Sequence, residues 1–324
     1  MFGRRIQKNN SWENLSGFRY AHRGLFHEPR TASLPVLAPL PHPLWQKDIA
    51  RWKEEGKRII PENTMAAFRI AVRHGFGSEL DVHLTKDGML PVFHDTSMLR
   101  MCALHRQIEE MTREEVSSCR LLDTDAGIPE LYEVLDLYTS DRALTDRTDA
   151  RDRDGGAGSG SGDRRRLYLP LIIELKAEKN VRQLCEAVME VIDRYPDLNY
   201  CIESFDPRVV FWFRRHRPEV IRGQLTENFC RSRDAVRKWG YIMTFGMWCG
   251  VPDILSRPDF ISSKFRDRKN LVMRLRHRLG VRQVNWTIQN HRQLADVDRE
   301  GGLSIFERFF PGERAGKADR NKSI

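Results

Sequence analysis

The sequence predicts an α/β fold, a single TIM-type (β/α)8 barrel with a long loop after the first strand and a hairpin near the second strand. Apolar strands alternate with amphipathic helices along most of the chain, and polar residues stand at the ends of several of these strands. A length of 324 residues is normal for one barrel domain. Alternating strands and helices favour a parallel sheet covered by helices, and a barrel gathers the strand C-termini around one site.

The composition is that of a globular protein, with 40% apolar and 31% charged residues. The chain has no run of eighteen apolar residues and no apolar stretch after its basic N-terminus, so we expect no transmembrane segment and a cytoplasmic location by default. Its six cysteines show no Cys-x-x-Cys spacing. We therefore expect reduced thiols rather than a zinc site or a disulfide framework.

The formal net charge of +9 comes mostly from arginine. An excess of this kind can attract anionic substrates, lipid surfaces or nucleic acid. In the run 266–278, however, apolar residues alternate with the arginines at helical spacing, which favours the wet face of an outer helix. No nucleic-acid motif is present, so we expect no nucleic-acid partner, and peripheral membrane contact stays open. The oligomeric state is not predicted.

The first predicted strand, Phe18 to Ala21, leads into His22 and Arg23. The following segment, residues 25–60, is rich in proline and leucine, and 48–57 within it could form a short amphipathic helix. Loops of this length inside a domain are usually functional or disordered, and two tryptophans argue against simple disorder. The segment either selects the substrate or roofs the barrel as a satellite core.

A helix follows, with Asn63 as its expected N-cap and Gly75 at its end. The next strand, Ser78 to Leu84, places Glu79 and Asp81 on the same side. Two carboxylates so placed repel each other unless a cation lies between them or one stays protonated. The pair therefore indicates half of a metal site or an acid/base pair.

An Asp-Gly turn at 87–88 and the apolar run 89–93 then lead to His94 and Asp95. This turn joins antiparallel neighbours, and counting 89–93 as a strand gives nine, one too many for the barrel. Part of the segment from Glu79 to His94 is therefore expected to form a hairpin that protrudes over the site.

Strands and helices alternate again from Leu167 onward. The strand 171–175 carries Glu174 on the same face as Lys176, and charged residues within an apolar strand are site candidates. Residues 141–166 consist mainly of Asp, Arg, Gly and Ser and are expected to form a flexible insertion. We expect one domain over 1–324, with its core at about 18–306 and a disordered tail at about 311–324.

Five short motifs occur in order along the chain. They are His22-Arg23-Gly24, Pro61-Glu62-Asn63-Thr64, Glu79-Leu80-Asp81, His94-Asp95 and Ile173-Glu174-Leu175-Lys176. In this order they resemble the glycerophosphodiester phosphodiesterase family, a phospholipase C-like phosphodiesterase barrel. Two later segments, 203–207 and 285–287, extend the resemblance over about 18–306. The chain departs from the family pattern in its two insertions and in lacking a clear Gly-rich final strand with an acidic residue.

The candidate residues form three groups. Three oxygen ligands without cysteine or paired histidine favour one Mg²⁺ or Ca²⁺, and the resemblance implies the same ligands: Glu79, Asp81 and Glu174. The expected acid and base are His22 and His94, with their individual roles open. The expected substrate or phosphate contacts are Arg23, Glu62, Lys176 and, from the late Trp-Thr strand of the resemblance, Trp286.

These residues predict metal-dependent hydrolysis of a small-molecule glycerophosphodiester to an alcohol and sn-glycerol 3-phosphate. Two alternatives remain open. One is lysophospholipase D-type hydrolysis of lipid phosphodiesters, which the same residues could perform. The other is a catalytically inactive barrel that binds anionic ligands, although a binding protein has no need of two acid/base groups.

Overall fold

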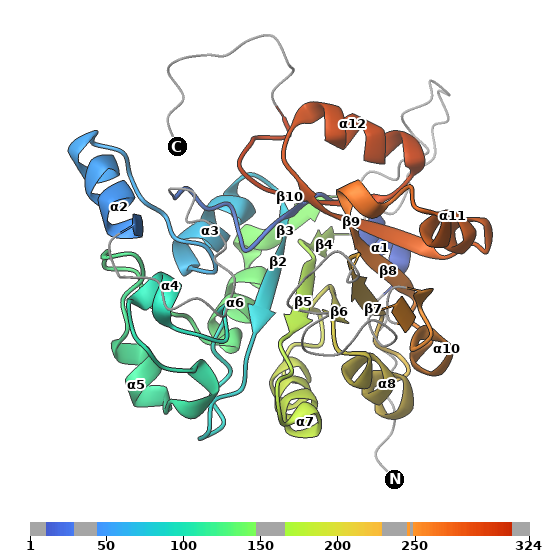
Figure 1. Ribbon diagram of the computed structural model, residues 1–324, viewed down its shortest axis with the longest axis horizontal. Coiled ribbons are helices and arrows are strands. Elements are labelled where there is room, and N and C mark those ends of the chain that lie inside the picture. Colours follow the sequence, from blue (N-terminus) through green and yellow to red (C-terminus); the bar gives the residue numbers. More distant parts are fainter. Residues whose placement is uncertain (1–10, 29–43, 147–165, 229–244, 247–248, 313–324) are drawn as a thin grey trace.

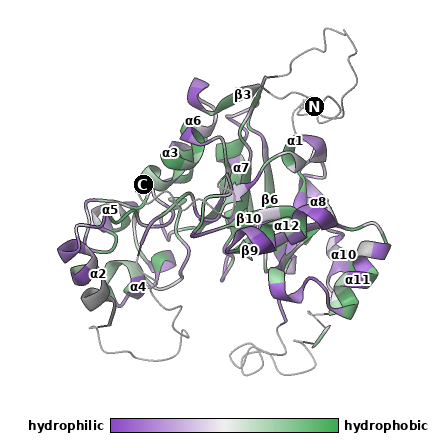
Figure 2. Cartoon of the chain, turned by 90° about the horizontal axis from the view of Figure 1, so that it is seen from above, coloured by the Kyte–Doolittle hydropathy of each residue, from purple (hydrophilic) through white to green (hydrophobic). Residues whose placement is uncertain are grey.

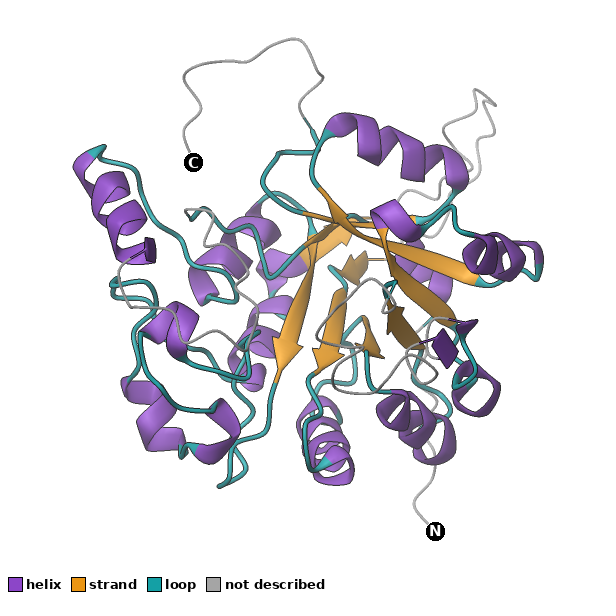
Figure 3. Ribbon diagram, in the orientation of Figure 1, coloured by secondary structure: helices purple, strands orange, loops and turns teal. Residues whose placement is uncertain are grey.

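The computed structural model describes residues 11–28, 44–146, 166–228, 245–246 and 249–312 (Figure 1). Eight parallel strands close into a barrel in the order β1-β10-β9-β8-β7-β6-β5-β2 (Figure 3). This confirms the predicted TIM-type fold. The barrel strands are β1 (Tyr20–Ala21), β2 (Gly77–Val82), β5 (Leu171–Leu175), β6 (Tyr200–Ser204), β7 (Arg222–Thr226), β8 (Phe260–Lys264), β9 (Arg282–Ile288) and β10 (Leu303–Phe306).

Helices surround the barrel and connect successive strands (Figure 1). The connecting helices are α3 (Met65–Arg73), α6 (Leu131–Tyr138), α7 (Val181–Ile192), α8 (Pro207–His216), α10 (Asp253–Ser256), α11 (Leu271–Arg278) and α12 (His291–Glu300). Additional helices are α1 (Trp12–Ser16), α2 (Leu44–Glu54), α4 (Leu99–Cys102) and α5 (Arg113–Ser118), together with short 3-10 turns η1 (Ile108–Glu110), η2 (Asp141–Ala143) and η5 (Phe265–Asp267).

Strand alternation divides the core into an inner and an outer part. On β5, Ile172 packs inside the barrel with Tyr20 and Phe260, whereas Ile173 packs outward against the helices. Glu174 is therefore an inward-facing residue, like Ile172 two positions earlier. The barrel interior is apolar at one end and carries charged groups at the C-terminal ends of its strands.

The predicted N-cap of α3 was wrong by one residue. Thr64 is the N-cap, since its hydroxyl accepts from the backbone N–H of Ala67 at 3.3 Å. Asn63 instead adopts a left-handed backbone, with φ of 54°, and its side chain donates to Asp81 at 2.8 Å. Asparagine tolerates this conformation better than most residues, which explains how it can leave the helix start and face the site.

The run 89–93 is not a ninth barrel strand. It folds back on the end of β2 through an antiparallel bridge between Val82 and Val92. Phe93 N–H donates to the Asp81 carbonyl at 2.9 Å, and His83 N–H donates to the Pro91 carbonyl at 3.2 Å. The expected hairpin therefore begins where β2 leaves the barrel, and it brings His94 back beside Asp81.

No helix or strand was predicted between Asp95 and Ser140, where the structure has α4, η1, α5 and α6. Together with the hairpin, this region builds a satellite core around buried residues such as Met98, Met101 and Leu122. Helix α2 joins it through Ile49. This packing supports the covering role for the described part of the segment 25–60; residues 29–43 lie outside the described residues.

The ends of the predicted insertion 141–166 are ordered. Residues 141–143 form η2, and β3 (Leu144–Asp146) pairs antiparallel with β4 (Arg166–Tyr168). The part that stays a prediction is 147–165, which lies outside the described residues, as does most of the predicted tail. Residues 234–239, for which the sequence also predicts a helix, lie outside them as well.

Two simpler expectations concern cysteines and membrane spans. The cysteines at 102, 119, 185, 201 and 249 are free thiols. Cys230 lies outside the described residues. Within the described ranges, no helix combines the length and the apolar character needed to cross a bilayer.

Candidate active site

Three carboxylates meet at the C-terminal ends of β2 and β5. The parallel register pairs Asp81 with Glu174, and Glu79 lies two residues earlier on β2. One oxygen from each of the three groups lies within 4.8 Å of the others, and all three residues are buried. Such a spacing of hard oxygen ligands fits a single Mg²⁺ or Ca²⁺ ion.

Two cationic side chains contact this carboxylate cluster. Lys176 Nζ lies 2.9 Å from Asp81 Oδ1 and 2.7 Å from Glu174 Oε1. Arg23 Nε lies 3.3 Å from Asp81 Oδ2, and the backbone N–H of Arg23 donates to Glu79 at 3.1 Å. Arg23 adopts a left-handed backbone with φ of 54°, which costs roughly 1 kcal/mol for a non-glycine residue. The contacts of Arg23 with the carboxylate cluster hold its backbone in this conformation.

Burial and mutual repulsion dominate the electrostatics of the cluster. Burial, followed by the charges of Asp81 and Glu174, raises the pKa of Glu79 well above its usual value. Burial also raises the pKa of Glu174, to about 7, against the opposing charge of Lys176. Burial would raise the pKa of Asp81 too, but Lys176 and the neighbouring cations hold it well below the usual range. A divalent cation would relieve this repulsion, so the residues fit the metal that the sequence predicted.

Each predicted acid/base histidine is held by a carboxylate through Nδ1. His22 Nδ1 lies 2.9 Å from Glu307 Oε2, and its Nε2 lies 3.9 Å from Glu79 Oε2. His94 Nδ1 lies 2.6 Å from Asp95 Oδ1. In both rings this leaves Nε2 as the nitrogen available for proton exchange.

The pKa of His94 is lowered to about 4, first by burial and then by the charges of Arg23 and Lys176. These influences outweigh the charge of Asp81 and the hydrogen bond that His94 Nδ1 donates to Asp95, both of which raise the pKa. His94 is therefore neutral near pH 7 and can accept a proton.

A second ionic network supports the site from the side. Glu62 accepts two hydrogen bonds from Arg23, each at 2.9 Å, and also pairs with Arg100. Arg100 in turn pairs with Asp95, the partner of His94. Burial would raise the pKa of Glu62, but Arg100 and Arg23 lower it to about 2. Glu62 therefore holds the Arg23 guanidinium in place.

Sequence reasoning missed four site residues. Arg100 carried no signal, since its contacts arise only in the folded chain, and Asn63 was assigned to the helix start although it lies in one of the five motifs. Glu307 directly follows the last apolar strand, which could have indicated it. Glu203 interrupts β6 as Glu174 interrupts β5, and the register pairs the two residues. Burial and then the charge of Glu174 raise the pKa of Glu203 to about 8, which favours its neutral form.

Trp286 lies on β9, opposite β5 in the strand order of the barrel. Its ring contacts Phe205 at 5.8 Å between centroids, and Lys264 Nζ lies 5.1 Å from the ring centroid. The structure therefore brings seven of the predicted residues into one connected network and places His94 beside it, whereas Trp286 stands at the far side of the barrel mouth. The connected residues are His22, Arg23, Glu62, Glu79, Asp81, Glu174 and Lys176.

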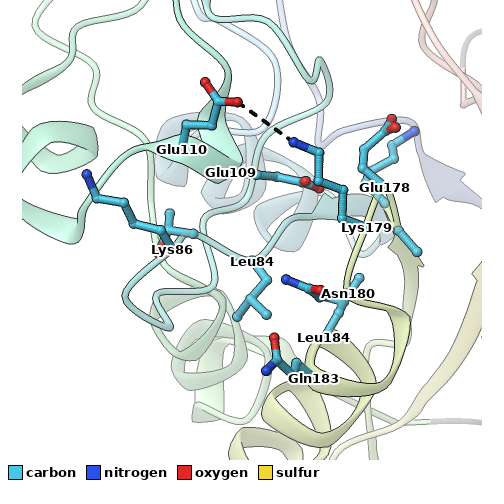
Figure 4. A pocket seen from close by; sticks show the side chains of 12 residues that line it. Leu84, Lys86, Glu109, Glu110, Glu178, Lys179, Asn180, Gln183 and Leu184 are labelled. Carbon is cyan, nitrogen blue, oxygen red and sulfur yellow. Dashed lines mark ion pairs between the residues drawn. The ribbon is translucent and has the colours of Figure 1, made fainter.

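A cavity of about 220 Å³ lies beside this site, between the residues that follow β2 and the start of α7 (Figure 4). Lys176 is the site residue that lines it. The apolar lining residues Leu84 and Leu184 belong to the outer core, whereas the carboxylate cluster faces the barrel interior. Figure 4 shows Lys179 paired with Glu110 across this cavity.

An eight-stranded barrel with a buried carboxylate cluster and two carboxylate-held histidines at its strand ends defines a TIM-barrel protein with a candidate cation and acid/base site. Residues 55–302 match the model of the glycerophosphoryl diester phosphodiesterase family. The chain belongs to this family, which the five sequence motifs had indicated.

Relatives called glycerophosphodiester phosphodiesterase occur in Caldanaerobacter subterraneus subsp. tengcongensis and Bacillus altitudinis. They are 42% and 44% identical to this chain over 85 and 86 residues, which cover 24% of this chain and 35% of each relative. This chain therefore spans about a third of the length of these curated relatives.

A solved structure, an Oleispira antarctica phosphodiesterase in complex with the product sn-glycerol-3-phosphate, is 17% identical with a TM-score of 0.59. The match covers 90% of this chain and 94% of that one. At this identity the likeness shows the fold alone.

Proposed function

We propose that this protein is a phosphodiesterase that hydrolyses glycerophosphodiesters to an alcohol and sn-glycerol 3-phosphate. The observation that carries the proposal is the placement of two carboxylate-held histidines beside a buried cluster of three carboxylates and two cations. Acid/base groups, cation ligands and phosphate-binding cations are the parts that phosphodiester hydrolysis requires. The names of the relatives and the product in the Oleispira complex support the same substrate class.

In this proposal Glu79, Asp81 and Glu174 hold one Mg²⁺ or Ca²⁺ ion. When bound, such an ion supplies charge that stabilises the phosphate oxygens as the reaction proceeds. Lys176 and Arg23 contribute fixed positive charge at the same place, since both already contact the carboxylate cluster. Their burial strengthens their attraction for an anionic phosphate.

The two histidines move protons. His94 acts as the base, because its neutral form is favoured and Asp95 holds its Nδ1 so that Nε2 accepts. It takes a proton from the attacking water as the new P–O bond forms. His22, held by Glu307, donates a proton to the alcohol oxygen as its bond to phosphorus breaks. The step consumes one water: its hydroxyl group ends on the phosphate, and a proton ends on the alcohol.

Two further residues have supporting roles in this proposal. Glu62 positions Arg23 and, through Arg100 and Asp95, the ring of His94. Trp286 forms a wall at the far side of the barrel mouth, next to Phe205, where the organic part of a substrate can pack.

The test measures release of the alcohol by purified protein from a panel of diesters, together with release of sn-glycerol 3-phosphate from those that carry no acyl chain. The panel contains glycerophosphocholine, glycerophosphoethanolamine, glycerophosphoinositol and a lysophospholipid, each with added Mg²⁺ or Ca²⁺ and with excess chelator. We expect cation-dependent release from at least one of the first three. Cation-dependent turnover of the lysophospholipid alone would support the lipid alternative, and no turnover with either ion would reject the proposal.

A further inference from the structure

A band of exposed apolar side chains lies on α10 and α11, away from the carboxylate cluster. Ile254 and Leu255 on α10 are 72% and 66% exposed. Leu271, Leu275 and Leu279 are 78%, 57% and 72% exposed. The last three recur every four residues, so they form one stripe along α11 and just past its end. Both helices lie at the same edge of the molecule in Figure 2, and an ion pair between Arg276 and Asp253 joins them.

This exposure reverses the orientation that is usual for an outer helix. On α11 the buried positions are Met273 and Arg276 rather than the leucines. Arg276 pairs with Asp253, which ties α11 to α10. Because that ion pair fixes the face that α11 turns to the barrel, the leucine stripe is held outward. Large exposed apolar patches of this kind usually mark an interaction site.

The charges around the stripe have a single sign. Arg257, Arg274 and Arg278 are exposed, and within the described part of the chain none of them forms an ion pair. The acidic residues of 249–279 each have a partner within the protein: Asp253 pairs with Arg276, Asp259 pairs with Arg222, and Asp267 accepts from the backbone N–H of Asn228. The α10–α11 surface, defined as Ile254, Leu255, Leu271, Leu275, Leu279, Arg257, Arg274 and Arg278, is therefore both apolar and basic.

We propose that the α10–α11 surface binds the interface of a bilayer that contains anionic lipids. Leucine and isoleucine side chains can enter the boundary of the acyl chains while arginines beside them contact lipid phosphates. A second copy of this chain fits less well, because a two-fold interface would set this basic surface against itself. The inference does not depend on the proposed catalytic activity.

The test measures co-sedimentation of the full chain with vesicles. One set is phosphatidylcholine alone, and the other contains phosphatidylcholine with phosphatidylglycerol. We expect binding to the second set that weakens as salt rises. Leu275→Glu with Leu279→Glu, and separately Arg274→Glu with Arg278→Glu, should each reduce the bound fraction at least about tenfold. The matched control is Arg182→Glu on α7 with Arg194→Glu just past its end. These side chains are 80% and 65% exposed, and the control should bind like wild type.

Thermal melting of each variant checks that the fold is kept. Failure of the wild-type protein to bind the vesicles that contain phosphatidylglycerol overturns the proposal, and so does unchanged binding in both α11 variants. A dimer in analytical ultracentrifugation that the leucine variant dissociates would assign the surface to a second copy instead. If binding appears only after residues 229–244 are replaced by a Gly-Ser linker, that segment of the chain is the occupant, and the proposal is wrong.

Discussion

His22 and Glu307 lie 285 residues apart in the sequence, yet His22 Nδ1 is 2.9 Å from Glu307 Oε2. The closed barrel makes β1 and β10 neighbours, so the ends of the first and last strands meet. The backbone N–H of His22 also donates to the Phe306 carbonyl at 2.9 Å, which fixes the register of the contact. Closure of the barrel therefore creates one of the two proposed catalytic pairs.

The His22–Glu307 pair predicts coupled effects on turnover. His22→Ala should lower kcat by about 10²-fold or more, and Glu307→Gln should lower it about 10-fold because the carboxylate no longer stabilises a protonated ring. The double variant should add little to His22→Ala. The control is Gln289→Ala, which removes only the neutral donor to Glu307. Wild-type kcat in Glu307→Gln would remove this carboxylate from the mechanism.

The lowered pKa of His94 predicts a pH profile for kcat/KM. A base must be neutral, and His94 is neutral above a pKa of about 4. With saturating cation, lowering the pH should not reduce activity until about pH 5, below which activity falls as His94 takes up a proton. His94→Ala should lower kcat by about 10²-fold or more with little change in cation affinity. An acid limb centred near 6.5 would contradict the neutral, buried base.

The carboxylate cluster predicts a change in cation requirement. Glu79→Gln, Asp81→Asn and Glu174→Gln should each raise the Mg²⁺ or Ca²⁺ concentration for half-maximal activity, because an amide binds a hard cation less well than a carboxylate. Glu203→Gln is the matched control, since burial already favours the neutral form of this neighbouring residue. Calorimetric titration with the ion gives a readout independent of turnover. Full activity in excess chelator would reject the cation site.

Glu62 predicts how stability depends on pH. Its folded pKa of about 2 lies below the usual 4.5, so its contribution is complete above about pH 4.5 and is lost as pH falls toward 2. Glu62→Gln should therefore destabilise the fold by about 3 kcal/mol at pH 7, because Arg23 and Arg100 lose their buried partner. The difference in melting temperature from wild type should shrink between pH 4.5 and 3. Glu115→Gln, at an exposed pair with Arg106, is the control and should have a smaller effect.

The composition of the insertion predicts that the protein tolerates its replacement by a short linker. Residues 147–165 are built mainly of Asp, Arg, Gly and Ser and cannot bury enough apolar surface to offset the entropy of ordering them. A short Gly-Ser linker between β3 and β4 should leave melting temperature and kcat nearly unchanged, since loop entropy grows slowly with length. A fall of several degrees in melting temperature would show that this stretch packs on the barrel.

The sequence alone determined the barrel and most of the site. The periods of its apolar residues distinguish strands from helices, and a carboxylate inside an apolar strand, such as Glu174, is a signal that survives without coordinates. Parallel strands also place their C-terminal residues at one end. Glu79, Asp81, His22 and Glu174 could therefore be assigned to one site from their positions in the strands.

The tertiary structure decided which groups touch. Whether 89–93 is a strand or a returning hairpin depends on how β2 and β5 pair, which a local pattern does not encode. Glu307 reaches the site because the barrel closes, and Arg100 reaches it because α4 packs beside the barrel. Asn63 reaches it because its own backbone is left-handed. The sequence also did not predict that the leucines of α11 face outward, because helical periodicity identifies an apolar face without showing which way that face points. The buried ion pair between Arg276 and Asp253 sets its direction.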